Sequence, residues 1–103
     1  VYQDVIDGTV NARALSNKVQ VIQQGDKIDV TFPSEQQSAS LTGTIWFYRP
    51  ENNRLDKKVP IEIHTGGMQQ VESGDIVPGR YKVKIDWKDG KSNYYQESDI
   101  YIQ

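Results

Sequence analysis

The sequence predicts an all-β domain, a small antiparallel β-sandwich of immunoglobulin-like character with about seven strands and a short N-terminal helix. Two observations support this prediction. Beyond Asn17, apolar and polar residues alternate in a series of short segments, as they do in half-buried strands. Turn-forming residues separate these segments wherever a chain reversal is needed. A barrel of about six or seven strands fits the same pattern and is the competing architecture.

Length and composition limit the classes of protein to which the chain can belong. A length of 103 residues suits one domain, covering residues 1–103. The net charge of −2, without a cluster of Lys and Arg, argues against nucleic acid as a partner. The absence of cysteine excludes disulfides, zinc–thiolate sites and thiol nucleophiles. The longest apolar runs are only a few residues, too short to span a bilayer.

The first expected element is a helix over residues 1–16. Its apolar residues, among them Val5, Ala12 and Leu15, fall near helical spacing. Gly8 and several β-branched residues lower the helix propensity of this segment. We therefore expect a helix that needs packing against the rest of the domain to persist.

Strands follow, because the apolar period drops to two. The alternating segments, in chain order, are residues 18–23, 27–32, 41–48, 59–63, 81–87 and 93–103. The residues expected to point into the core include Phe32, Ile45, Phe47, Ile61, Val83, Ile85 and Trp87. In the last segment, polar Gln96 and Ser98 share a face with Ile100, which predicts a bulge or a frayed half.

Turn chemistry defines the ends of these strands. Reversals are expected around Gly25, after Pro50, at Thr65, at Pro78 and around Gly90. The pair Asp89-Gly90 is the strongest hairpin signal in the chain. Pro60 lies inside an alternating segment, so that strand should form a sheet edge, where a missing N–H costs little.

The aromatic residues divide into two groups. Tyr81 and Trp87 share a phase with core residues and should be buried. Tyr81 begins its strand, where the hydroxyl of a sandwich tyrosine often ties back a neighbouring loop. Trp46 and Tyr48 lie on the opposite, threonine-bearing face of their strand. They either cover a second apolar surface, such as one against the N-terminal helix, or are exposed and bind a partner.

Two further tyrosines extend this candidate surface. Tyr95 and Tyr101 share the charged face of the last strand and could flank the same patch as Trp46 and Tyr48. A strip of aromatic rings could stack on a small ligand or a carbohydrate. The chain is therefore also a candidate for a ligand-binding module.

No arrangement typical of an enzyme is present in the sequence. The one histidine, His64, has no recognisable nucleophile partner, and no Gly-rich phosphate loop follows a strand. His64 and Met68 flank a Gly-Gly turn, and imidazole with thioether suits copper. Two ligands make an incomplete site, and a hairpin turn with a surface His and a partly buried Met explains the same residues. We expect no catalysis and no metal centre. If copper does bind, His64 and Met68 are the candidate ligands.

Residues 43–61, "GTIWFYRPENNRLDKKVPI", resemble the strand-turn-strand signature of FixH-family proteins, in the form found in Bacteroidetes. The matched residues are Phe47, Tyr48, Arg49, Pro50, Asn52, Leu55, Asp56, Pro60 and Ile61. Residues 2–15 are similar to the juxtamembrane helix of that family, and residues 78–102 to its C-terminal hairpin. The resemblance thus covers nearly the whole chain.

This resemblance implies a role that composition does not. FixH-like proteins are single-pass membrane proteins with a small β domain on the periplasmic side of the cytoplasmic membrane. They help to assemble cbb-type cytochrome c oxidases, alongside a copper-transporting ATPase. The resemblance implies a juxtamembrane helix at 1–16, a β domain at 18–103 and a membrane anchor before Val1. The implied partners are membrane oxidase-assembly proteins or oxidase subunits, and no catalytic residues carry over. A copper-handling domain is a further alternative.

The segment "FYRP", residues 47–50, ends an expected strand and lies within the FixH-like signature. Pro50 fixes its own φ and biases Arg49 towards an extended conformation, so the turn should be presented rigidly. Arg49 could pair with Asp56 across the hairpin and merely hold the turn. Alternatively, Tyr48, Arg49 and the turn could dock a membrane-protein partner, because Tyr and Arg often contribute most of the binding energy at interfaces.

Overall fold

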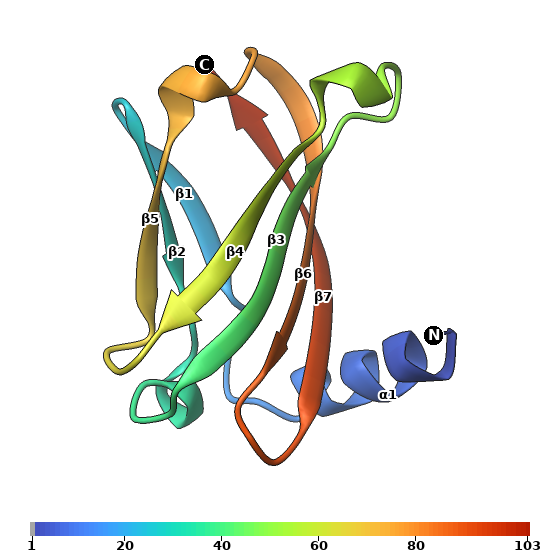
Figure 1. Ribbon diagram of the computed structural model, residues 1–103, viewed down its shortest axis with the longest axis vertical. Helices are drawn as coiled ribbons and strands as arrows, with labels where there is room; N and C mark the ends of the chain where they lie inside the picture. The colour runs from blue at the N-terminus through green and yellow to red at the C-terminus, as the bar shows by residue number, and fades with distance from the viewer. Residues whose placement is uncertain (1) are drawn as a thin grey trace.

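The computed structural model describes residues 2–103 and is shown in Figure 1. Within this range the chain forms one helix, followed by seven strands. The elements are α1 (Tyr2–Arg13), β1 (Gln20–Gln24), β2 (Lys27–Thr31), β3 (Leu41–Tyr48), β4 (Lys57–Ile63), β5 (Met68–Glu72), β6 (Gly79–Lys88) and β7 (Asn93–Ile102). Three 3-10 turns connect strands: η1 (Ser34–Gln36), η2 (Asn53–Leu55) and η3 (Ser73–Asp75).

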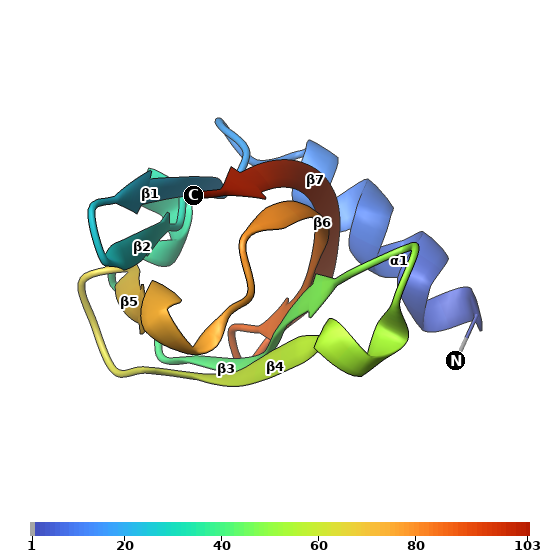
Figure 2. The same cartoon turned by 90° about the horizontal axis from the view of Figure 1, so that it is seen from above.

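The strands form a β-sandwich, as predicted. Over the described residues, one sheet has the order β1-β2-β5 and the other the order β4-β3-β6-β7, with antiparallel pairing throughout. The view from above shows the two sheets facing each other, with α1 outside β7 (Figure 2). No backbone ladder joins the two sheets in this part of the chain, so the competing barrel does not form. β4 is an edge strand, as Pro60 predicted, and it pairs with β3.

The core lies between the two sheets. All seven residues predicted to point inward are buried, with exposed fractions of 0–1%. Tyr81 and Trp87 are also buried, and the Tyr81 hydroxyl donates a hydrogen bond to the carbonyl of Val77. This bond fixes the loop before β6, the role predicted for a tyrosine at that position.

One strand, β5, was missing from the alternating segments of the sequence. Only Val71 of this strand is buried, so its sequence MQQVE carries almost no apolar periodicity. The turn at Thr65 was also misjudged as a hairpin. It leads from β4 in one sheet to β5 in the other, because β5 pairs with β2 rather than with β4.

The predicted bulge in the last strand is wrong. Pairing between β6 and β7 is continuous from Gly79 opposite Ile102 to Lys88 opposite Asn93. Gln96 points inward without disrupting the strand because the backbone of Val19 satisfies its side-chain amide, which accepts from the N–H at 2.8 Å and donates to the carbonyl at 3.0 Å. The amide thus ties β7 to the segment that leads into β1.

Helix α1 packs on β7 through a glycine. Gly8 is buried, and a Cβ there would lie 2.9 Å from the backbone carbonyl carbon of Tyr94. Asn11 donates to the carbonyl of Asn93 at 2.8 Å, and Asn93 donates to the carbonyl of Asp4 at 3.0 Å. The residue that weakens the helix in isolation is therefore the one that lets it approach the sheet.

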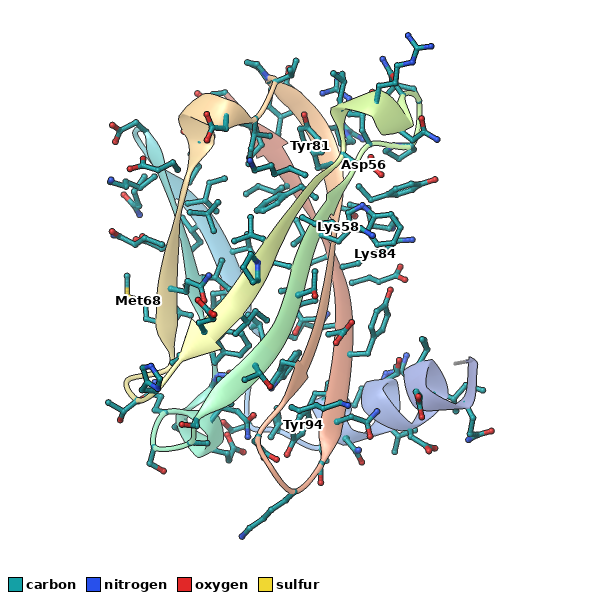
Figure 3. The ribbon with its side chains drawn as sticks, in the orientation of Figure 1. Asp56, Lys58, Met68, Tyr81, Lys84 and Tyr94 are labelled. Carbon is teal, nitrogen blue, oxygen red and sulfur yellow. The ribbon has the colours of Figure 1, made fainter. Side chains whose placement is uncertain are left out.

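A polar network closes the lower end of the core, near Tyr94 in Figure 3. The indole N–H of Trp87 donates to the buried Gln36 Oε1 at 2.8 Å, and Gln36 Nε2 donates to Asp89 Oδ2 at 3.2 Å. The Tyr94 hydroxyl donates to the same carboxylate oxygen at 2.8 Å, and its ring stacks on Trp87 with centroids 5.1 Å apart. Each polar group at this end of the core thus has a partner.

This network predicts a pH-dependent contribution to stability. Burial by itself would raise the pKa of Asp89, but hydrogen bonds from the N–H groups of Ser92 and Lys91 and from Tyr94 outweigh it and lower the pKa from 3.8 to about 2. Because the folded-state pKa is depressed, the contribution is present above pH 3.8 and is lost as pH falls towards 2. Discounted for partial exposure, the contribution is about 1 kcal/mol.

The substitution Asp89→Asn tests this pH-dependent contribution to stability. The difference in unfolding free energy between the parent chain and Asp89→Asn, from urea titrations, should shrink by that amount between about pH 5 and about pH 2. A difference that stays constant over this range would show that the Asp89 carboxylate is not stabilised in the folded state.

Candidate functional site

The outer face of the β4-β3-β6-β7 sheet carries most of the candidate binding residues. Alternation along β3 places Ile45 and Phe47 in the core, so Trp46 and Tyr48 point outward. The strand register aligns Lys58 of β4, Trp46 of β3, and Lys84 of β6 in one row across the sheet. Residues from three strands therefore meet at one place on this face.

We call Trp46, Tyr48, Lys58 and Lys84 the Trp46 cluster. The rings of Trp46 and Tyr48 meet edge to face, with centroids 5.4 Å apart and planes at 72°. The ammonium of Lys58 lies 4.5 Å from the indole centroid, and that of Lys84 lies 4.9 Å from the indole and 4.3 Å from the phenol. Lys58 and Lys84 project from the strands on either side of β3, on the same side of the sheet in Figure 3. Each contact is a cation–π interaction within the usual range.

Asp56 anchors this cluster to the turn after β3. Its Oδ2 accepts a hydrogen bond from the Trp46 indole N–H at 3.0 Å, and its Oδ1 accepts from the backbone N–H of Arg49 at 2.8 Å. The turn itself is capped by Asn52, whose side chain accepts from the N–H of Arg54 at 3.1 Å. The indole is therefore held in one orientation.

Charge is distributed unevenly over the outer face. Lys82 lies 3.6 Å from Asp99 and 4.0 Å from Glu97, both on β7. Lys58 and Lys84, by contrast, have no carboxylate oxygen within 4.0 Å among residues 2–103. The face is thus positive beside Trp46, at Lys58 and Lys84, and negative along β7, with Glu62 and Asp86 further along β4 and β6.

The two tyrosines of β7 lie on the same face but apart from the Trp46 cluster. β6 separates β7 from β3, so the two groups are roughly 10 Å apart across the sheet. Tyr95 is half-buried, and its hydroxyl donates to Glu97 at 2.7 Å. Burial raises the pKa of Tyr95 above its ordinary value, and the Glu97 carboxylate raises it further. Tyr101 is 63% exposed. The four outward aromatics share a face without forming a continuous strip.

Trp46 and Tyr48 do not cover a surface beneath the N-terminal helix. Helix α1 packs on β7 instead, so that alternative is wrong. The two rings are half-buried because they pack on each other and under the two lysine side chains of the cluster.

Arg49 takes different partners from the expected one. Its Nε donates to Glu51 at 2.8 Å and a terminal nitrogen donates to the carbonyl of Pro78 at 3.0 Å, while the guanidinium lies 4.9 Å from the Tyr81 ring centroid. The predicted side-chain pairing with Asp56 is wrong, because alternation turns the Arg49 side chain to the core side of β3. The side chain is only 15% exposed, and its part in docking remains a prediction.

Arg49→Ala should therefore lower thermal stability. The substitution removes the tie between the end of β3 and the loop before β6, and it exposes the edge of the Tyr81 ring. We expect the Tm to fall by several degrees in a thermal melt followed by circular dichroism. Arg54→Ala, in the same turn but with an exposed side chain, is the matched control and should leave the Tm nearly unchanged. Equal Tm values for both variants would contradict the structural role of Arg49.

His64 and Met68 flank the crossover from β4 to β5. Both are exposed, and the Met68 side chain, at 46% exposure, is more open than the partly buried position expected for it. Met68 points away from the sandwich in Figure 3. Within residues 2–103, His, Asp and Glu side chains form no group of three or more that could hold a metal ion. Copper binding by His64 and Met68 stays a prediction.

Sequence reasoning missed Lys58 and Lys84 as part of the site, and it gave Asp56 the wrong partner. The signal that could have found the cluster is the pairing of residues 41–48 with the strands on either side, which places two lysines beside one tryptophan.

Comparison with known protein families gives one match. The FixH family model matches residues 1–101. The chain belongs to the FixH family. The strand-turn-strand segment of this FixH chain, residues 43–61, contributes Trp46, Tyr48, Asp56 and Lys58 to the site described above. No curated protein and no solved structure matches it. Among residues 2–103 of the FixH chain, no helix combines the length and the hydrophobicity that a membrane span requires.

Proposed function

We propose that this chain is the non-catalytic, periplasmic interaction domain of a membrane-anchored FixH protein. In this proposal an anchor precedes Val1, and the domain helps to assemble a cbb-type cytochrome c oxidase. The partners are membrane oxidase-assembly proteins or oxidase subunits, and the domain contacts them through the outer face of its four-stranded sheet. Nucleic acid has no part in this function.

Membership of the FixH family over residues 1–101 is the observation that carries this proposal. The Trp46 cluster supports the choice of surface. Trp and Tyr are among the residues that most often contribute binding energy at protein interfaces. β3 is an inner strand paired on both sides, and the Asp56 hydrogen bond fixes the indole, so little side-chain entropy is lost when a partner binds.

Co-purification tests the proposal. The full-length protein, tagged and expressed in its native host, should retain oxidase subunits or assembly proteins in mild detergent, and deletion of its gene should reduce assembled oxidase. Trp46→Ala with Tyr48→Ala should reduce both retention and assembly. Ile22→Ala, on the exposed side of β1 in the other sheet, is the control and should leave both unchanged. Normal oxidase assembly in the deletion strain would refute the proposed function.

The geometry supports the two alternative functions less well. A sugar ring stacks on an open aromatic face, whereas the Trp46 and Tyr48 rings lie at 72° to each other and both are covered by lysine ammonium groups. Glycan binding lost in Trp46→Ala would nevertheless establish a carbohydrate-binding module. Copper-dependent thermal stabilisation lost in His64→Ala would establish a copper-handling domain.

A further inference from the structure

The Trp46 cluster holds two positive charges beside one indole ring. The Lys58 and Lys84 ammonium groups lie 4.5 and 4.9 Å from the indole centroid. A cation–π contact at an exposed site is worth only about 0.5–1 kcal/mol. Each ammonium group has three N–H donors, and a carboxylate placed beside it can accept from them.

Three carboxylates on or beside this face are engaged elsewhere, and the other two, Glu62 and Asp86, lie further along β4 and β6 from the row of Lys58, Trp46 and Lys84. Both oxygens of Asp56 accept N–H groups, one from Trp46 and one from the backbone of Arg49. On β7, Glu97 accepts the Tyr95 hydroxyl and lies near Lys82, and Asp99 lies near Lys82 as well. Lys58 and Lys84 therefore have no carboxylate oxygen within 4.0 Å among residues 2–103, although Glu97 is opposite Lys84 in the strand register.

We propose that the Trp46 cluster binds a carboxylate-rich segment of a protein partner, with Lys58 and Lys84 contacting its carboxylates and Trp46 and Tyr48 packing against its side-chain stems. This inference rests on the proposed function, since it specifies the chemistry of the partner at that surface. Complementary charge would direct the partner to this part of the sheet and set its orientation.

The shape of the charged area favours an acidic peptide segment over a broad anionic surface. The positive charges beside Trp46 are Lys58 on β4 and Lys84 on β6, on either side of uncharged β3, while Glu97 and Asp99 make β7 negative and Glu62 and Asp86 lie further along β4 and β6. A flat anionic membrane or a nucleic acid lying on the sheet would meet these carboxylates and be repelled. Membrane-surface binding also takes clusters of about four to eight basic residues, more than the Trp46 cluster holds. A narrow acidic segment can lie at the Trp46 end of β3 and avoid these carboxylates.

Peptide titration of residues 1–103, followed by amide chemical shifts, tests the inference. Hexaglutamate should shift the resonances of Trp46, Tyr48 and Lys84, and hexaglutamine should not. Raising NaCl from about 50 mM to about 500 mM should weaken hexaglutamate binding, because exposed charges are screened. Lys58→Gln with Lys84→Gln should weaken it by about two- to thirtyfold, the effect of losing two exposed charge contacts.

A charge-matched control separates this site from general electrostatics. Lys18→Gln with Lys91→Gln removes the same charge at exposed positions elsewhere and should leave hexaglutamate affinity unchanged. The indole resonance of buried Trp87 confirms that both double variants are folded. Equal affinity in the two double variants would overturn the inference. Binding of phosphatidylglycerol vesicles without binding of hexaglutamate would also overturn it.

The inference and the proposed function can fail separately. If oxidase subunits co-purify equally well with the parent protein and with the Lys58→Gln, Lys84→Gln variant, and hexaglutamate does not bind, the acidic-segment inference fails while the function stands. If hexaglutamate binds at the Trp46 cluster but deletion of the gene leaves oxidase assembly normal, the function fails while the binding chemistry stands.

Discussion

Trp87→Ala is expected to lower the free energy of unfolding by about 3–5 kcal/mol, as large-to-small substitutions of buried aromatic residues do. Trp87 is 1% exposed, its ring stacks on Tyr94, and Phe32 meets it edge to face with centroids 5.2 Å apart. The substitution leaves a cavity between the sheets and also removes the hydrogen bond to buried Gln36. Urea unfolding followed by far-UV circular dichroism measures the loss.

Two further variants separate the contribution of the Trp87 hydrogen bond from that of its buried ring. Gln36→Leu keeps the Trp87 ring but leaves its indole N–H unpaired, which should cost about 1–3 kcal/mol. Trp46→Ala removes the other tryptophan, from the half-buried outer face, and should cost clearly less than Trp87→Ala. If Trp87→Ala and Trp46→Ala were equally destabilising, the assignment of Trp87 to the core would be wrong.

Gly43→Ala should strongly lower the free energy of unfolding, although it only replaces a hydrogen by a methyl group. Gly43 lies in β3 between Ile61 and Trp87 on the neighbouring strands, and its φ is +150°. A Cβ there would lie 2.0 Å from the Asp86 carbonyl oxygen and 2.8 Å from the Trp87 Cα. Backbone cannot yield as a flexible side chain can, so we expect a loss of about 2–4 kcal/mol in urea unfolding.

Gly25→Ala is the matched control for Gly43→Ala. Gly25 also has a positive φ, of +62°, but a Cβ there meets no atom within 4 Å. This substitution should cost only about 1 kcal/mol, the conformational strain without the steric clash. A Gly43→Ala variant no less stable than Gly25→Ala would mean that β3 and β6 do not approach as closely as described.

Local pattern was sufficient to predict most of the strands and the core. Alternation along residues 41–48 and 81–87 separates inward from outward residues, because a strand turns successive side chains to opposite faces. The same rule placed Trp46 and Tyr48 outside and Trp87 inside, and the structure confirms each. Pro60 predicted an edge strand from its missing N–H alone. The FixH resemblance, read from residues 43–61 and their flanks, is confirmed by the family match.

Other features depend on residues that are distant in sequence, and only the tertiary structure decided them. β5 has a single buried residue, so only its pairing with β2 identifies it as a strand. Alternation turns Gln96 inward, but only the fold brings the backbone of Val19, far away in the chain, to its side-chain amide.

The Trp46 cluster also depends on residues that are distant in sequence. The pairing of β3 with both β4 and β6 brings Lys58 and Lys84 to one indole. Periodicity within one strand determines which face a side chain occupies. The register between strands, set by packing of the whole core, determines which side chains it meets there.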